Sequence, residues 1–136
     1  MTEEDAKIWL TTTFDVSRET QERLEAFVAF LIAEAQLQNL ISAATLEHIW
    51  ARHIIDSAQL LRYAPGEGDW LDLGSGAGFP GLIIPILSSH RVVLVESRAK
   101  RIDFLGRAIE LLGLQDVAVV AGMPLERLGT APYSVI

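Results

Sequence analysis

A run of four glycines behind a short apolar segment constrains the fold of this chain more than any other feature. Residues 69–81 read DWLDLGSGAGFPG, and the glycines are Gly74, Gly76, Gly78 and Gly81. Glycine accepts positive φ and lets a ligand approach the backbone closely, and a helix that begins after the turn presents free N–H groups. The stretch therefore predicts a strand, a glycine turn and a helix, arranged as a cradle for a nucleotide-type ligand.

Strands and helices alternate from residue 70 onward. Pro80 suits the first turn of the helix after the glycines, whereas Pro85 either removes a helical hydrogen bond or marks a late helix start. Gly113 provides the stop of the next helix. This alternation predicts an α/β fold with a parallel sheet and right-handed crossovers. The expected elements are a strand at 70–73, a helix at 81–87, a strand at 91–95, a helix at 97–112, a strand at 117–121, a short helix or turn at 124–128 and a strand that begins at 133.

Two amphipathic helices are expected before the sheet. One begins after Ser17 as its N-cap and keeps helical spacing to residue 35, with its acids facing water. The other begins after Thr45 as its N-cap and ends before the turn signal Pro65-Gly66. Residues 1–16 show no sustained period and are expected to be a loose lead-in. The chain thus divides into a lead-in with a two-helix cap at 1–66 and a sheet-containing domain at 67–136.

Composition and charge exclude several classes of protein. No cysteine is present, which excludes disulfides and thiolate metal sites. The longest aliphatic stretch before a proline, 82–84, is far shorter than the roughly 20 residues of a membrane helix. Residues 2–5 are acidic where an export signal is basic, so we expect a cytoplasmic protein. The net charge of −7 argues against a general phosphate-binding surface, although residues 41–136, with ten acids and eight bases, leave room for local basic patches.

Two carboxylates bear on which ligand the turn holds. Glu96 ends the second predicted strand, 20 residues after Gly76, where an acid can accept hydrogen bonds from both ribose hydroxyls of an adenosine. Gly76, Gly78 and Gly81 satisfy the dinucleotide pattern G-x-G-x-x-G. Asp72, however, would repel a pyrophosphate and would favour the cationic amino and sulfonium groups of S-adenosylmethionine. We therefore expect S-adenosylmethionine. An alternative for the function is a nicotinamide or flavin oxidoreductase fragment. An alternative for Asp72 is that its carboxylate only caps nearby backbone N–H groups.

Three motifs in order carry a resemblance to a known family. The run LDLGSGAGFPG, with VESRAKRIDFL after it and NLISAATLEHIWARHIIDS before it, resembles the bacterial small-subunit ribosomal RNA methyltransferase G family, also called glucose-inhibited division protein B. The match runs from about residue 21 to residue 136. Family members are class I S-adenosylmethionine-dependent enzymes that make 7-methylguanosine in 16S ribosomal RNA. The resemblance therefore implies a Rossmann-like methyltransferase domain behind an N-terminal helical cap.

The resemblance also implies the residues of a site. It puts the cofactor against Gly74, Gly76 and Phe79, the ribose on Glu96, and the adenine beside Leu125 and Glu126. Asp72 and Gly78 complete the candidate cofactor site. Guanine N7 has a lone pair and no hydrogen, so it can attack the sulfonium methyl in line without a general base. The protein would contribute positioning and a suitable electrostatic environment, and we name no catalytic residue and no metal ligand.

Substrate RNA would be contacted by basic residues in two of the motifs. The candidates are Arg52 and His53 in ARHIIDS, and Arg98, Lys100 and Arg101 in ESRAKR. Each also has an ordinary structural interpretation. Arg52 can form an ion pair with Asp56 one turn later, His53 flanks an apolar stripe, and the bases of the second motif lie on the solvent side of a helix.

Family members continue through several more strands than this sequence contains. We therefore expect a sheet whose C-terminal part is missing, with an edge at 133–136 that leaves backbone N–H and C=O groups unpaired. Such a chain is expected to be poorly soluble or dimeric and not to methylate RNA. A non-catalytic, truncated methyltransferase fold is thus a further alternative.

Overall fold

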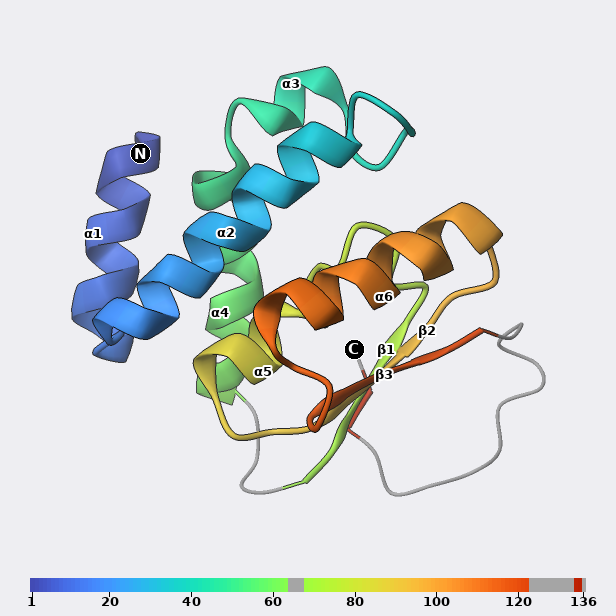
Figure 1. The fold of residues 1–136 in the computed structure, drawn as a ribbon. Coiled ribbons are helices and arrows are strands. Elements are labelled where there is room, and N and C mark those ends of the chain that lie inside the picture. The colour runs from blue at the N-terminus through green and yellow to red at the C-terminus, as the bar shows by residue number, and fades with distance from the viewer. Residues whose placement is uncertain (64–67, 123–133, 136) are drawn as a thin grey trace.

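The chain folds into a parallel sheet with helices packed against it (Figure 1). The computed structural model describes residues 1–63, 68–122 and 134–135. The helices are α1 (Glu3–Phe14), α2 (Arg18–Glu34), α3 (Ala43–Leu46), the π-helix η1 (Ile49–Ile54), α4 (Ile55–Tyr63), α5 (Ile83–Leu87) and α6 (Ala99–Leu112). The strands are β1 (Trp70–Leu73), β2 (Val92–Val95), β3 (Ala118–Ala121) and β4 (Ser134–Val135). The predicted helix or turn at 124–128 lies outside the described residues.

All strand pairings in the sheet are parallel, in the order β3-β2-β1-β4. Trp70 is in register with Val92 on one side and with Ser134 on the other. β1 is therefore central among the described strands, and the glycine turn leaves the middle of the sheet. The prediction of an α/β fold with a parallel sheet and the predicted strand positions are confirmed.

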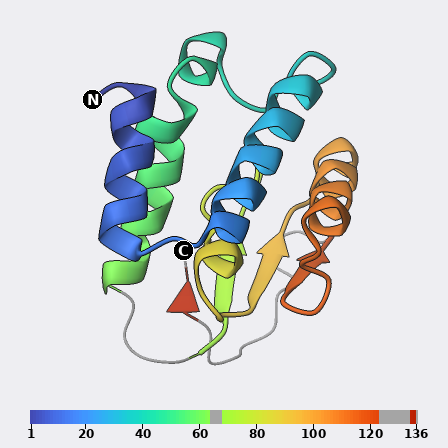
Figure 2. The same ribbon diagram turned by 60° about the vertical axis from the view of Figure 1, so that its left-hand side comes forward.

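Helices α2 and α6 lie side by side over the sheet (Figures 1 and 2). Phe30 of α2 stacks on Phe104 of α6 with ring centroids 5.3 Å apart. The Glu34 carboxylate accepts two hydrogen bonds from the Arg107 guanidinium, at 3.0 and 2.7 Å. Its side chain is only 8% exposed. The prediction that the acids of this helix all face water is therefore wrong for Glu34, because a partner 73 residues away compensates its burial.

Glu34→Gln is expected to destabilise the fold by about 1–2 kcal/mol, because an amide nitrogen would face the guanidinium donors. Hydrogen bonds from Arg107 hold the pKa of Glu34 below its ordinary value of 4.5. A depressed pKa contributes stability above the unfolded-state value and loses it as pH falls through the folded-state value. In urea unfolding, the difference in free energy of unfolding between wild type and variant should therefore be largest at pH 7 and should shrink below about pH 4.5. Glu110→Gln, exposed on α6, is the control, and an equal effect there would contradict the assignment.

The expectation that residues 1–16 form a loose lead-in is wrong. Thr2 and Asp5 form a reciprocal capping box at the start of α1. Ala6 and Leu10 are fully buried. The Glu3 carboxylate accepts hydrogen bonds from the backbone N–H groups of Trp50 and Ala51, in the first turn of η1, at 3.0 and 2.8 Å. Helix α1 is thus fixed both by its own cap and by contacts with a segment more than forty positions away.

The second predicted helix is divided into three elements. Ser42, not Thr45, is the N-cap: its hydroxyl accepts a hydrogen bond from the Thr45 N–H at 3.2 Å. The π-helix η1 then runs directly into α4, and Ile49, Trp50 and Ile54 of the predicted apolar stripe are buried. The N-cap prediction failed because two hydroxyl residues three positions apart are both competent caps, and the sequence does not rank them.

The remaining helices begin and end close to the predicted positions. Ser17 caps α2 as predicted, by accepting a hydrogen bond from the Thr20 N–H. Helix α5 begins at Ile83, so Pro85 lies in its first turn, where no helical donor is needed; the late-start alternative is confirmed. Helix α6 ends at Gly113, whose φ of 66° is left-handed. Within the described ranges no helix is long and apolar enough to cross a membrane.

Candidate functional site

The glycine turn joins the carboxyl end of β1 to α5 and is tied to the neighbouring strand. The N–H groups of Gly74 and Ser75 both donate to the carbonyl oxygen of Val95, at 2.9 and 3.1 Å. Gly74 and Gly76 have φ of 75° and 52°, which favour glycine. A Cβ built on Gly74 would meet no atom within 4 Å, and one on Gly76 would meet only a carbonyl oxygen at 3.9 Å. These two residues therefore present open backbone at the centre of the sheet edge.

Gly78 and Gly81 serve packing instead. A Cβ on Gly78 would lie 2.9 Å from Leu82, and one on Gly81 would collide with the side chains of Leu94 and Asp72. The turn must approach β1 and β2 this closely for the Gly81 N–H to reach the Asp72 carboxylate. The protein itself accounts for both glycines, and the predicted cofactor contact of Gly78 stays a prediction.

The Glu96 carboxylate joins the end of β2 to the glycine turn. Its Oε1 accepts a hydrogen bond from the Gly76 N–H at 2.9 Å, and its Oε2 accepts from the N–H groups of Ser97 and Arg98, both at 3.0 Å. Burial would raise the pKa of Glu96, but these three hydrogen bonds and the charge of Arg101 outweigh it and hold the pKa below its ordinary value. The ionised carboxylate has about four acceptor positions, so one remains on Oε1.

Asp72 lies behind the turn and is 3% exposed. Its Oδ2 accepts a hydrogen bond from the Gly81 N–H at 3.1 Å, which is the capping contact of the alternative interpretation. Burial raises the pKa of Asp72 to about 6, and the negative charge of Glu96 acts in the same direction. Two carboxylates therefore meet at one end of neighbouring strands, and the more buried one is costly to ionise.

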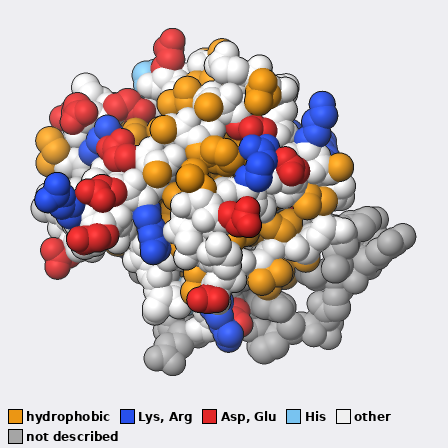
Figure 3. Space-filling view, in the orientation of Figure 1, with side chains coloured by type: hydrophobic (Ala, Val, Ile, Leu, Met, Phe, Trp, Pro, Cys, Tyr) orange, Lys and Arg blue, Asp and Glu red, His pale blue; other side chains and the backbone are white. Residues whose placement is uncertain are grey.

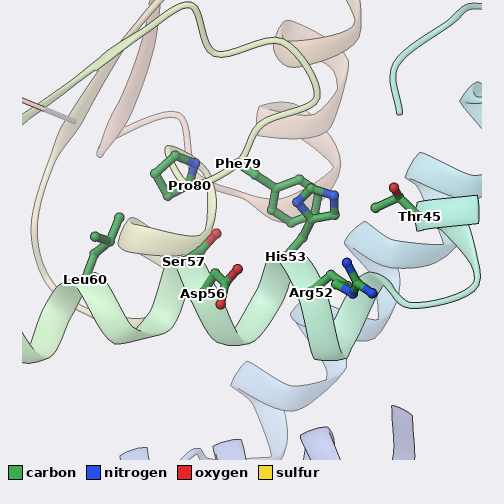
Figure 4. A pocket seen from close by; sticks show the side chains of 8 residues that line it. All are labelled: Thr45, Arg52, His53, Asp56, Ser57, Leu60, Phe79 and Pro80. Carbon is green, nitrogen blue, oxygen red and sulfur yellow. The ribbon is translucent and has the colours of Figure 1, made fainter. Parts of the chain in front are cut away.

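A pocket of about 530 Å³ opens beside the turn, between Phe79-Pro80 and the helix formed by η1 and α4 (Figure 4). The Phe79 and His53 rings stack with centroids 4.7 Å apart and planes 17° from parallel. The Nε2 atom of His53 is buried and has no hydrogen-bond partner among the described residues. Burial lowers the pKa of His53 and outweighs the opposing charge of Asp56, so the imidazole is neutral at pH 7.

The predicted RNA-contacting residues fall into two groups. Arg52 and His53 line the pocket. Lys100 is exposed at the start of α6, and the Arg101 guanidinium donates to the carbonyl oxygen of Asn39 at 3.2 Å, which ties α6 to the segment after α2. In the described part of the face in Figure 3, Lys and Arg side chains are scattered among acids and form no continuous basic patch. The contact of any of these residues with RNA stays a prediction.

Leu125 and Glu126, predicted to lie beside the adenine, are outside the described residues. The sequence reasoning also passed over residues that the structure brings to the pocket. These are Thr45, Asp56, Ser57, Leu60 and Pro80. A usable signal was present in residues 52–60, where the spacing of three to four puts polar side chains on one face of a helix.

Comparisons with known proteins agree with this architecture. The profile of the family described as rRNA small subunit methyltransferase G matches residues 20–135. The ribosomal RNA small subunit methyltransferase G of Zymomonas mobilis is 49% identical over 145 residues, which cover 100% of this chain and 65% of the relative. That of Sphingopyxis alaskensis is 52% identical over 136 residues, which cover 98% and 58%, and that of Rhizorhabdus wittichii is 49% identical over 139 residues, which cover 100% and 63%.

The chain therefore spans between 58% and 65% of the length of these three curated relatives. The family match begins at the second helix and includes β1, the glycine turn, Glu96 and the start of β4. It covers every described residue of the candidate cofactor site. On this match the chain belongs to the rRNA small subunit methyltransferase G family.

Proposed function

We propose that this chain forms the cofactor-binding part of an enzyme that transfers a methyl group from S-adenosylmethionine to small-subunit ribosomal RNA, at N7 of a guanosine in the 16S molecule. The observation that carries the proposal is the Glu96 carboxylate at the end of β2, bound to the Gly76 N–H of an open glycine turn. Family membership supports the reaction class, because the matched relatives are named for it.

The residues present fit S-adenosylmethionine. Gly74 and Gly76 leave open space above the backbone, which an amino-acid moiety would need. Glu96 keeps one acceptor position for a ribose hydroxyl, and a second hydroxyl would have to replace the Gly76 N–H. Asp72 and Glu96 make the end of the sheet negative, which favours a cationic ligand over a pyrophosphate. This charge is the reason to prefer S-adenosylmethionine to a nicotinamide or flavin dinucleotide.

When bound, S-adenosylmethionine supplies an electrophilic methyl on a sulfonium. The chain's own residues would hold and orient the reactants. The turn at Gly74–Gly76 and Glu96 would hold the methyl donor, and the pocket at Phe79 lies directly beside them. Because guanine N7 carries no proton, the step needs no base. Catalysis then consists of alignment and of the electrostatics of a partly buried site.

Calorimetry on the 136-residue chain tests the cofactor assignment. S-adenosylmethionine and its demethylated product are expected to bind and to compete for one site, whereas NAD is not expected to bind. Glu96→Gln should weaken binding by ~1–3 kcal/mol through loss of a charge-assisted hydrogen bond, and exposed Glu110→Gln should not. Preferential binding of NAD would replace this proposal with the oxidoreductase alternative.

Transfer of labelled methyl tests the substrate. The acceptors to compare are 16S ribosomal RNA, intact small subunits and large-subunit RNA, with the product nucleoside identified by digestion. Label in 7-methylguanosine of 16S RNA is the expected result for the protein carrying the family's full length. Label at another position or on the large-subunit RNA would contradict the N7 and 16S assignments.

A further inference from the structure

The pocket beside the glycine turn has the size of a ligand site and lies next to the candidate cofactor site. Its volume of about 530 Å³ is within the range of small-molecule pockets. Phe79 and Pro80 form one side and belong to the turn itself; η1 and α4 form the other (Figure 4). An occupant would therefore lie against the same loop that presents Gly74 and Gly76.

One wall of the pocket is aromatic and apolar. The rings of Phe79 and His53, stacked on each other across the turn and η1, form its aromatic part, and Leu60 and Pro80 extend it. Planar aromatic side chains are the surfaces on which proteins stack the unpaired bases of RNA. The buried Nε2 of His53, without a partner among the described residues, is a polar atom still to be satisfied within this wall.

The helix side of the pocket, which also carries His53 and Leu60, bears two charges of opposite sign. Arg52 and Asp56 line the pocket from the same helix, and both side chains are exposed. The ion pairs found among the described residues involve neither of them, so the alternative in which Arg52 pairs with Asp56 is not observed. Both charges therefore face an occupant.

Guanine matches this arrangement and adenine does not. The Watson–Crick edge of guanine offers two adjacent donors, N1–H and the N2 amino group, which one carboxylate can accept together. Adenine offers an acceptor at N1, which a carboxylate repels. The donor edge lies across the base from N7, so a carboxylate that holds this edge leaves N7 free to react.

We propose that this pocket binds the acceptor guanine of the RNA, with Asp56 accepting hydrogen bonds from N1–H and N2 and the base lying against Phe79 and His53. Arg52 is placed to contact the phosphate of the same or a neighbouring nucleotide. The proposal rests on the proposed function, because it identifies the substrate subsite of the same methyl transfer.

Binding to the 136-residue chain tests this without catalysis. The probes are the single-stranded pentanucleotides UUGUU and UUAUU and free guanosine monophosphate. Each is titrated into the protein while NMR monitors the amide and ring resonances of residues 45–60 and 79–80. UUGUU is expected to bind at least roughly tenfold more tightly than UUAUU and to shift these resonances. It should also bind more tightly than guanosine monophosphate. Equal binding of the two pentanucleotides, or tighter binding of the free nucleotide, would overturn the proposal.

Asp56→Asn is the decisive variant. The amide keeps one acceptor and adds a donor opposite guanine's donors, so the affinity for UUGUU should fall by roughly tenfold while that for UUAUU changes little. Asp116→Asn, an equal charge change on an exposed loop residue, should leave the preference intact. Retained preference for UUGUU in Asp56→Asn, with an unchanged thermal melt, contradicts the recognition of guanine by Asp56.

S-adenosylmethionine calorimetry separates the two proposals. Normal cofactor binding without guanine preference refutes only the guanine subsite. Guanine preference without cofactor binding refutes only the methyl transfer.

Discussion

Replacing Gly76 with valine is expected to lower the affinity for S-adenosylmethionine by at least about 100-fold, equivalent to about 2.7 kcal/mol. The valine side chain would occupy open space, in which a Cβ on Gly76 would meet only a carbonyl oxygen at 3.9 Å. Its φ of 52° is also unfavourable for a β-branched residue, so the turn would shift and the Gly76 N–H would leave Glu96. Calorimetry with S-adenosylmethionine measures the loss.

The matched control for this change is Gly113→Val. Gly113 has a similar φ of 66°, and a Cβ there would meet nothing within 4 Å, but it lies at the end of α6. Both variants should lose stability through backbone strain of roughly 1–2 kcal/mol, and only Gly76→Val should lose cofactor binding. Wild-type affinity in Gly76→Val would refute the placement of the cofactor on this turn.

The sheet was predictable because its signals are local. β1 and β2 are short apolar runs, and Gly113 ends α6. Both strands and the end of this helix lie within a residue or two of their predicted positions. The parallel pairing followed from the alternation of strand and helix. The positions of Asp72 near the end of β1 and of Glu96 directly after β2 were likewise predictable, since both follow from where the apolar runs end.

The N-terminal segment was predicted badly because tertiary contacts decide it. Helix α1 has only Ala6 and Leu10 buried, too few for a visible period, yet Glu3 binds backbone groups of η1. Thr2-Glu3-Glu4-Asp5 did contain a capping-box pattern, which was the available local signal. The burial of Glu34 could not be predicted, since its partner Arg107 is on another helix.

The pocket was the least predictable part of the candidate site. His53 and Phe79 are 26 positions apart and come from two motifs that sequence reasoning assigned to different ligands. Only the packing of η1 against the turn brings the two ring centroids to 4.7 Å from each other. Burial of a side chain's polar atom, as for the Nε2 of His53, depends on neighbours from distant elements and has no local pattern.

Asp72→Asn is expected to stabilise the fold at pH 8 by about 2–3 kcal/mol. Burial raises the pKa of Asp72 from 3.8 to about 6, so the folded state holds this proton more tightly than the unfolded state does. The resulting stability is fully present below about pH 3.8 and is lost as pH rises through about 6. An asparagine oxygen can still accept the Gly81 hydrogen bond without carrying a buried charge.

The same substitution should weaken binding of the cationic cofactor, because a negative charge behind the turn disappears. A residue that costs stability when ionised and improves ligand binding is typical of functional sites. Urea unfolding measures the change in stability, with wild type and variant compared at pH 8, 6 and 4.5 and Asp116→Asn as control. Calorimetry at pH 8 measures the change in cofactor affinity. The stability advantage should shrink steadily as pH is lowered, whereas a constant difference would show that Asp72 does not titrate in this range. Unchanged cofactor affinity alongside the expected pH dependence would leave Asp72 with the capping role alone and would remove the electrostatic argument for a cationic ligand.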